Sequence, residues 1–166
     1  DQFLHPSGNR REDAYGGAVE NFCRFALEVV DAVTARIGGE RTGLRLSPGA
    51  YVHMEADPQD RAIFDHLLSE LNQRQLAFLH LGIFDDNLTF DYLEGRASDY
   101  LRSRYQGNLI TVGGYTPELA REALSAQRAD LIAIGRPLIA NPDYIQKIQT
   151  GGELAAYSDE LLTELN

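Results

Sequence analysis

The amino-acid sequence predicts an α/β fold with a parallel sheet. Four short β-rich runs alternate along the chain with amphipathic helical patterns, which is typical of βα units. The last two runs end in glycine turns that open helices. The chain has 166 residues, enough for one domain, whereas a (β/α)8 (TIM) barrel has eight strands and typically ~250 residues. The sequence therefore predicts either about half of such a barrel or a small open α/β sheet.

The amino-acid composition limits the kinds of molecule that the chain is expected to bind. Lys and Arg number 15 against 25 Asp and Glu, a formal net charge of −10, so we expect no broad binding to nucleic acid or to anionic membranes. No apolar run reaches the ~18 residues of a membrane span, and no signal peptide is visible. The single cysteine, Cys23, cannot form a disulfide within the chain, which favours a cytoplasmic setting.

The first half of the chain contains two predicted helices and two predicted strands. Apolar residues at spacings of three and four give each helix one apolar stripe, and Gly38 and Gly39 end the first helix. Cys23 lies beside the first stripe, and we interpret it as a core thiol. In order, the predicted elements are a loop over residues 1–17, a helix over 18–37, a strand over 42–48, a helix over 59–73 and a strand over 76–81.

Several polar residues in this half need a partner or a function. Arg45 lies between two leucines of the first strand and must point to the opposite face from them. Because an unpaired buried charge is costly, Arg45 is either bonded to a carboxylate at the strand rim or faces a ligand. We interpret His80, in the second strand, as a buried and hydrogen-bonded side chain. The loop over residues 49–58 carries Tyr51 and His53 without any metal-ligand spacing, so we predict no metal site.

The second half continues the alternation after a long loop over residues 82–95. Loops of this length in compact domains are often functional, and this one is rich in aromatic and acidic residues. The predicted elements that follow are a helix over residues 99–105, a strand starting at Leu109, a helix over 117–125, a strand starting at Leu131, a helix over 143–150 and a final amphipathic segment.

The two glycine turns are the candidate binding site. Gly113 and Gly114 follow the third strand, and Thr116 then has the position of a helix N-cap. Gly135 follows the fourth strand and lets a ligand approach the backbone closely, while Arg136 adds a planar donor fork suited to phosphate. The carboxyl ends of parallel neighbours lie at one edge, where barrels of this class bind phosphate. The alternative for both turns is an ordinary strand-to-helix connection.

Several stretches of the chain resemble one enzyme family. Those that carry the resemblance are Asn9-Arg10-Arg11-Glu12-Asp13-Ala14-Tyr15-Gly16-Gly17, Gly43-Leu44-Arg45-Leu46-Ser47-Pro48, Val112-Gly113-Gly114-Tyr115 and Gly135-Arg136-Pro137-Leu138-Ile139-Ala140-Asn141-Pro142-Asp143. In order and spacing they resemble the old yellow enzyme family, the FMN-dependent NAD(P)H ene-reductases, which are TIM barrels. The resemblance covers nearly the whole chain. It implies that residues 1–166 are the carboxyl-terminal half of a single flavin-binding barrel domain.

The resemblance also implies a cofactor and its binding residues. Arg45 would contact the flavin ring near its N1 and C2 carbonyl, and Gly113 and Gly114 would offer backbone N–H groups to the FMN phosphate. Gly135 and Arg136 would complete that phosphate site. NAD(P)H would reduce the FMN, and the enzyme would reduce activated C=C bonds of enones, maleimides or nitro compounds. The family's substrate-anchoring His-His or His-Asn pair and its proton-donating Tyr lie at the end of the fourth strand, which is expected to precede this chain. The catalytic residues of this chain therefore stay unknown.

Two functions from different classes remain open. In the first, the chain is half of an ene-reductase and needs the missing amino-terminal half-barrel. In the second, it is a non-catalytic FMN- or phosphate-binding half-barrel that self-associates. Both predict a partner chain, because an open half-barrel leaves strand edges and apolar faces exposed. Another phosphate-binding barrel family is a third interpretation, which residues 9–17 argue against.

Overall fold

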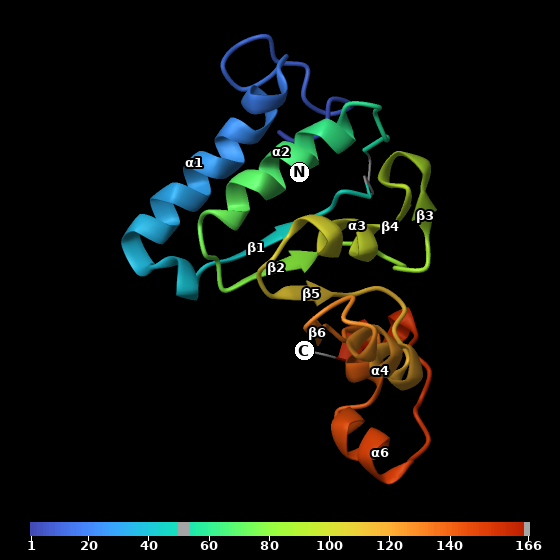
Figure 1. Ribbon diagram of the computed structural model, residues 1–166. Helices are drawn as coiled ribbons and strands as arrows, with labels where there is room; N and C mark the ends of the chain where they lie inside the picture. Colours follow the sequence, from blue (N-terminus) through green and yellow to red (C-terminus); the bar gives the residue numbers. More distant parts are fainter. Residues whose placement is uncertain (50–53, 165–166) are drawn as a thin grey trace.

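The fold is built on a parallel four-stranded sheet (Figure 1). The computed structural model describes residues 1–49 and 54–164. The strands lie in the order β1-β2-β5-β6, and their bounds are Gly43–Leu46, Phe78–Leu81, Leu109–Thr111 and Leu131–Ile132. Strands that follow one another along the chain are therefore neighbours in the sheet, as βα units require. The predicted α/β fold with a parallel sheet is confirmed.

Helices connect these strands. The α-helices are α1 (Val19–Ile37), α2 (Asp60–Asn72), α3 (Ala97–Arg104), α4 (Pro117–Ser125), α5 (Arg136–Ala140) and α6 (Tyr144–Thr150), and short 3₁₀ turns are η1 (Gly39–Arg41), η2 (Asp91–Leu93) and η3 (Asp159–Glu164). Figure 1 shows α1 and α2 side by side at one end of the sheet and α4 and α6 at the other. The predicted alternation of helices and strands is confirmed.

The structure contains elements that were not predicted from the sequence. The long loop over residues 82–95 contains a small antiparallel hairpin, in which β3 (Thr89–Phe90) pairs with β4 (Gly95–Arg96) around η2. Its apolar side chains anchor it, because Leu93 is buried and Phe90 packs against the core. A further difference is α5, a short helix that begins at Arg136, because the helix expected after this turn was placed at residues 143–150, where α6 lies.

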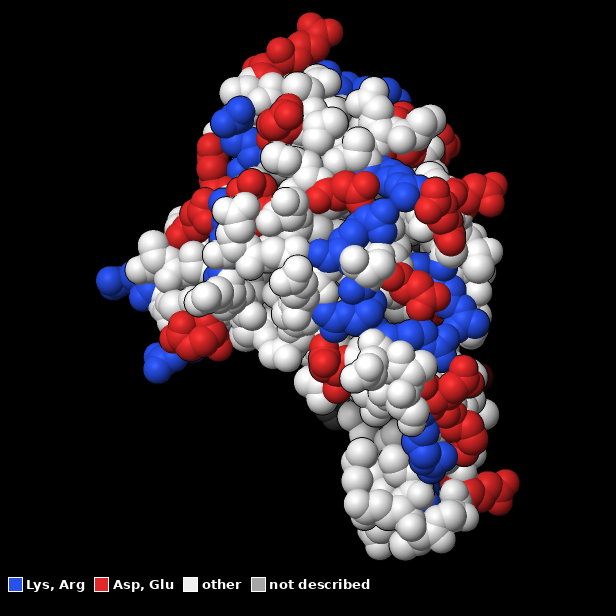
Figure 2. Space-filling model, in the orientation of Figure 1, with Lys and Arg blue, Asp and Glu red and all other residues white. Residues whose placement is uncertain are grey.

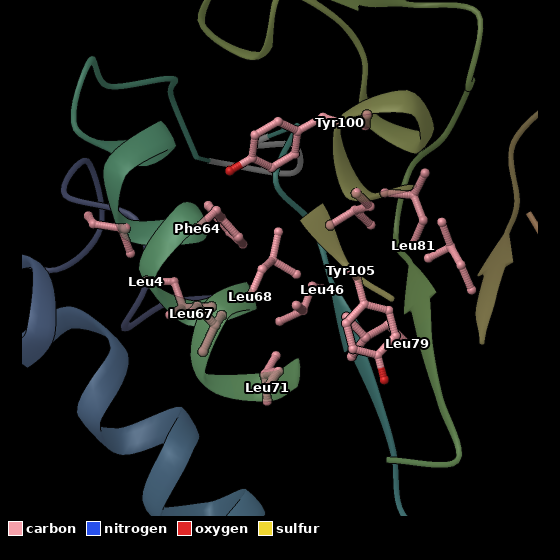
Figure 3. Close-up of a cluster of buried hydrophobic side chains, with 14 of the residues drawn as sticks. Leu4, Leu46, Phe64, Leu67, Leu68, Leu71, Leu79, Leu81, Tyr100 and Tyr105 are labelled. Atoms are coloured by element: carbon pink, nitrogen blue, oxygen red, sulfur yellow. The ribbon is translucent and has the colours of Figure 1, made fainter. Parts of the chain in front are cut away.

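The hydrophobic core lies between one face of the sheet and the helices α2 and α3 (Figure 3). Leu46 of β1 is buried in this core whereas Arg45 is exposed, so the predicted alternation along the strand is confirmed. The buried side chains at the centre of the cluster are Leu46, Phe64, Leu67, Leu68, Leu71, Leu79, Leu81, Tyr100, Leu101 and Leu109.

The opposite face of the sheet is open. Arg45, His80, Ile110 and Leu131 stand side by side across the strands on that face, since each is the register partner of the next. Arg45 and Leu131 are exposed, the latter by 58%, and His80 and Ile110 are only half-buried. A parallel sheet usually has both faces covered, so this face lacks the cover that such sheets normally have.

Buried polar contacts fix the amino-terminal segment and α1. The ring of His5 is fully buried, with Nδ1 3.0 Å from Asp60 Oδ1 and Nε2 3.2 Å from the Ser47 carbonyl oxygen. The Cys23 thiol donates to the Ile63 carbonyl oxygen at 3.3 Å, and burial raises the pKa of Cys23 to about 12. Cys23 is therefore a core thiol, as the sequence predicted, whereas the His5 contacts were not foreseen.

The surface carries mixed charge. In Figure 2, Lys and Arg side chains stand among Asp and Glu side chains over the face in view. Many of these charges are paired between elements, as in Arg61–Glu94 at 2.6 Å and Arg102–Asp130 at 3.0 Å. No helix in the described part of the chain is both long and apolar enough to cross a lipid bilayer.

Candidate functional site

The two glycine turns leave the sheet at the same edge. β5 and β6 are parallel neighbours, and Thr111 at the end of β5 is level with Ile132 at the end of β6. Gly113 and Gly114 follow β5 after Val112, and Gly135 follows β6 after Ala133 and Ile134. The structure thus brings the four predicted phosphate-binding residues to one rim, because Arg136 comes next in the chain.

The glycines of the first turn are required by its shape. Gly113 and Gly114 have φ angles of +115° and +71°, which side chains rarely adopt. A Cβ on Gly113 would also lie only 2.8 Å from the backbone nitrogen of Asp86. Gly135 differs, since a Cβ there would meet no atom within 4 Å. The absence of a side chain at Gly135 therefore leaves open space beside the backbone.

The helix after the first turn begins as predicted. Thr116 Oγ1 accepts a hydrogen bond from the Leu119 backbone nitrogen at 3.3 Å, and Pro117 occupies the first helical position of α4. This cap fixes where the chain leaves the glycine turn.

A buried carboxylate holds the first turn in place. Asp86 is 3% exposed, and its backbone nitrogen donates to the Gly113 carbonyl oxygen at 3.2 Å. Its side chain accepts hydrogen bonds from the Ser98 backbone nitrogen at 3.3 Å and from the Tyr115 hydroxyl. Burial raises the pKa of Asp86, and burial together with the Asp86 contact raises the pKa of Tyr115 to about 12. The loop after β2 is thereby attached to the turn after β5.

A small polar cavity lies beside this attachment. It has a volume of about 10 Å³ and is lined by Tyr115, Arg96 and Arg128 among others. Arg128 Nε is buried there without a hydrogen-bond partner among the described residues. A space of this size holds at most a single water molecule, so we do not place a ligand in it.

Arg136 is an exposed cation that contacts two aromatic rings. Its guanidinium carbon lies 4.6 Å from the ring centroid of Phe84, in the loop after β2, and 5.7 Å from that of Tyr157, in the final segment. Within residues 1–49 and 54–164, Arg136 makes no ion pair. Its charge is therefore not neutralised by a described carboxylate, which leaves it available for an anion.

Arg45 stands on the open face of β1, the edge strand at the other side of the sheet from β6. None of the described residues forms an ion pair or hydrogen bond with it, so the rim carboxylate considered from the sequence is not among them. A Cβ on Gly82 would lie 3.0 Å from Arg45 Nε, which shows that the Arg45 side chain reaches over the end of β2.

His80, the register partner of Arg45, differs from its prediction. Its Nε2 is buried without a hydrogen-bond partner among the described residues, so the expected hydrogen bond was wrong. Burial and the neighbouring charge of Arg45 lower the pKa of His80, so the ring is neutral at pH 7. Tyr51 and His53 lie outside the described residues. The described residues contain no cluster of three or more His, Cys, Asp or Glu side chains that could hold a metal ion.

Comparisons with known proteins identify the family of the chain. Residues 1–155 match the model of the NADH:flavin oxidoreductase / NADH oxidase family. A putative 12-oxophytodienoate reductase-like protein 1 of Arabidopsis thaliana is 36% identical over 155 residues, which are 93% of this chain and 48% of that protein. A probable flavin mononucleotide-dependent alkene reductase of Leishmania infantum is 38% identical over 156 residues, which are 93% of this chain and 41% of the relative.

Solved structures give the same result. Morphinone reductase in complex with tetrahydroNAD superposes with a TM-score of 0.82 at 38% identity, covering 96% of this chain and 42% of the other. The old yellow enzyme homologue from Zymomonas mobilis has a TM-score of 0.83 at 33% identity, with 96% and 45% covered. The chain spans less than half the length of the proteins it matches. It belongs to the NADH:flavin oxidoreductase / NADH oxidase family, the old yellow enzyme family that its motifs resemble.

Proposed function

We propose that this chain is the carboxyl-terminal half of a flavin-binding (β/α)8 barrel and that it holds the phosphate of FMN. In the complete enzyme, NAD(P)H would be the reductant, and activated C=C bonds, as in enones, maleimides or nitro compounds, would be reduced. The observation that carries the proposal is the meeting of two glycine turns and an unneutralised arginine, Arg136, at one rim of a sheet in a member of this family.

Exposed strand edges, an open sheet face and an exposed apolar stripe on α1 support the half-barrel part of the proposal. β1 and β6 are edge strands, and the sheet face that carries Arg45 is open. On α1, Phe25, Val29, Val33 and Ile37 recur every four residues and are each at least 38% exposed. An apolar stripe of this kind is normally covered by a neighbouring helix. We therefore treat residues 1–166 as half of one domain, and the amino-terminal half-barrel as the partner.

The residues present fit FMN. Gly135 leaves room for an oxygen-rich group next to the backbone, and Arg136 supplies five N–H donors in a plane. We assign Gly113 and Gly114 to the same phosphate, because their turn leaves the sheet at the same edge as the turn that carries Gly135 and Arg136. FMN, when bound, supplies the electron-transfer chemistry that no side chain here provides. Arg45 would supply a fixed positive charge to the ring from the open face, and we assign no proton donor to this chain.

FMN binding by the chain, followed through quenching of flavin fluorescence, tests this proposal. We expect Arg136→Ala to weaken FMN binding by about 10- to 100-fold, since a hydrogen bond to a charged group contributes ~1.5–3 kcal/mol. Arg121→Ala is the matched control, because Arg121 is exposed on α4 and pairs with Glu118. Riboflavin, which has no phosphate, should respond to neither substitution.

The outcomes separate the two candidate functions. FMN binding that appears only after an amino-terminal half-barrel is added, together with NAD(P)H oxidation, supports the split enzyme. FMN binding by a self-associated chain, with no NAD(P)H oxidation even when that half is added, favours the non-catalytic module. The open sheet face and the stripe on α1 would serve either partner. An absence of FMN binding both alone and with the added half would contradict the proposal.

A further inference from the structure

Arg136 is the meeting point of segments that are distant in the sequence. Phe84 reaches it from the loop after β2, and Tyr157 reaches it from the segment between α6 and η3. The guanidinium carbon is 4.6 Å and 5.7 Å from the two ring centroids, within the range of a cation–π contact. We call Phe84 and Tyr157 the aromatic pair.

The exposure of Phe84 indicates that its ring is not there to build the core. The side chain is 64% exposed, the largest fraction among the exposed large apolar residues of the described chain, and Phe84 is absent from the buried cluster. Two neighbours of Phe84 in the same loop have structural partners: Ile83 is buried in the core, and Asp86 holds the glycine turn. The recorded ring contact of Phe84 is the one with Arg136.

A separate set of hydrogen bonds, made by the side chain of Asn141, places Tyr157 near Arg136. Asn141 is fully buried, and its side-chain nitrogen donates to the carbonyl oxygens of Pro137 at 2.9 Å and Ala155 at 3.0 Å. Its side-chain oxygen accepts from the Ala155 backbone nitrogen at 2.8 Å and from Lys147 Nζ at 2.9 Å. Asn141 thus fastens the final segment to α5 two residues before Tyr157.

The ring contacts of Arg136 do not require its N–H donors. A guanidinium contacts rings through its face, whereas its five N–H groups point outward in its own plane. The aromatic pair can therefore restrict the rotamers of Arg136 without using any donor that a phosphate needs. A side chain that is already restricted loses less conformational entropy when it binds.

We propose that Phe84 and Tyr157 are positioning residues that hold the Arg136 guanidinium ready for the phosphate, an inference that rests on the proposed function of Arg136. The pair acts on the phosphate end of the cofactor through Arg136 and not on the flavin ring. Asn141 contributes to the same positioning of Arg136, because its hydrogen bonds to Ala155 fix the segment that carries Tyr157.

The test combines a ligand-free measurement with two flavins. In the ligand-free chain, NMR should show the Arg136 side-chain protons shifted upfield by the ring currents, and Phe84→Leu should reduce this shift. FMN binding should weaken about threefold in Phe84→Leu and about tenfold when Tyr157→Leu is added, as expected for two cation–π contacts at an exposed site. Riboflavin binding should not change. Phe84→Tyr should restore both the shift and the FMN affinity, and Leu88→Ala, an exposed position in the same loop, is the control.

Several results would overturn the inference. Equal losses of FMN and riboflavin affinity in Phe84→Leu would mean that the ring touches the flavin itself. Arg136 resonances that do not respond to Phe84→Leu would mean that the pair does not hold the guanidinium. If the wild-type chain binds no FMN under any condition, the proposed function fails by itself, and the ring-current shift still decides whether the aromatic pair holds Arg136.

Discussion

The two ends of the sheet are built differently. Around β1, β2 and β5, the buried apolar side chains form one continuous cluster, whose last member along the chain is Leu109. Beyond Leu109, the buried apolar residues of the described chain are Ala123, Ala129 and Tyr144, and Leu131 of the short strand β6 is mostly exposed. We call residues 1–111 the packed region and residues 112–164 the rim region.

This difference separates stability from the candidate site. The packed region has the cluster that drives folding, while the glycine turns and Arg136 belong to the rim region, where turns and polar contacts predominate. Sites that must admit a ligand are commonly drawn from the less stable parts of a protein. We therefore expect truncation of a side chain in the buried cluster to lower stability much more than truncation of an exposed side chain in the rim region.

The largest effect is expected from a core truncation. Leu68→Ala removes a fully buried side chain of α2 and should lower the free energy of unfolding by ~2–5 kcal/mol in urea titrations. Leu138→Ala, in α5, removes a side chain that is 45% exposed and should change it by no more than ~0.5 kcal/mol. Similar losses for both variants would show that the two regions do not differ in the way described.

An intermediate effect is expected at the glycines of the rim. Gly113→Ala should cost ~1–3 kcal/mol of stability, because φ is +115° and the new Cβ would collide with the Asp86 backbone. Gly135→Ala meets no neighbouring atom and should leave stability within ~0.5 kcal/mol of wild type. FMN titration should nevertheless show weaker binding for both. Unchanged FMN binding in Gly135→Ala would remove Gly135 from the site.

The smallest effect concerns pH. The pKa of Asp86 is raised in the folded chain, so the folded state binds this proton more tightly than the unfolded state does. The resulting stabilisation is fully present below the unfolded pKa of about 3.9 and is lost as the pH rises through the raised pKa. The stability of wild type relative to Asp86→Asn, measured by urea unfolding at a series of pH values, should fall across that window. A pH-independent difference would contradict this.

Much of the fold was predictable because its signals are local. The helical periodicity of α1 and the Thr116 cap of α4 are each encoded by neighbouring residues, and the structure has both the helix and the cap. The stripe of α1 is only partly buried, because Phe22 and Val30 are covered whereas Val29, Val33 and Ile37 are exposed. The hairpin formed by β3 and β4 was missed, since it depends on burying Leu93 and Phe90 in a core built by distant residues. The length of β6 was also unpredictable, because pairing with β5 decides where a strand ends.

In the candidate site, too, the contiguous motifs could be predicted from the sequence and the long-range contacts could not. The glycine turns and Arg136 were found from the sequence, because each motif is contiguous, although their roles are still predictions. The contacts that hold them were not found. Tyr115 and Asp86 are separated by 29 positions, and nothing in the residue types near Phe84 indicates that it would contact Arg136. His80 was expected to be hydrogen-bonded, and a pattern of alternating residues cannot reveal a missing partner.

The buried thiol of Cys23 makes its rate of alkylation a measure of how often the folded chain opens. Cys23 is the single cysteine, and alkylating reagents attack the thiolate, which a thiol with a pKa of about 12 scarcely forms near neutral pH. A maleimide offered as a test substrate should therefore leave the folded chain unmodified. Any slow labelling of Cys23 that does occur would record how often α1 separates from α2 and breaks the hydrogen bond to Ile63.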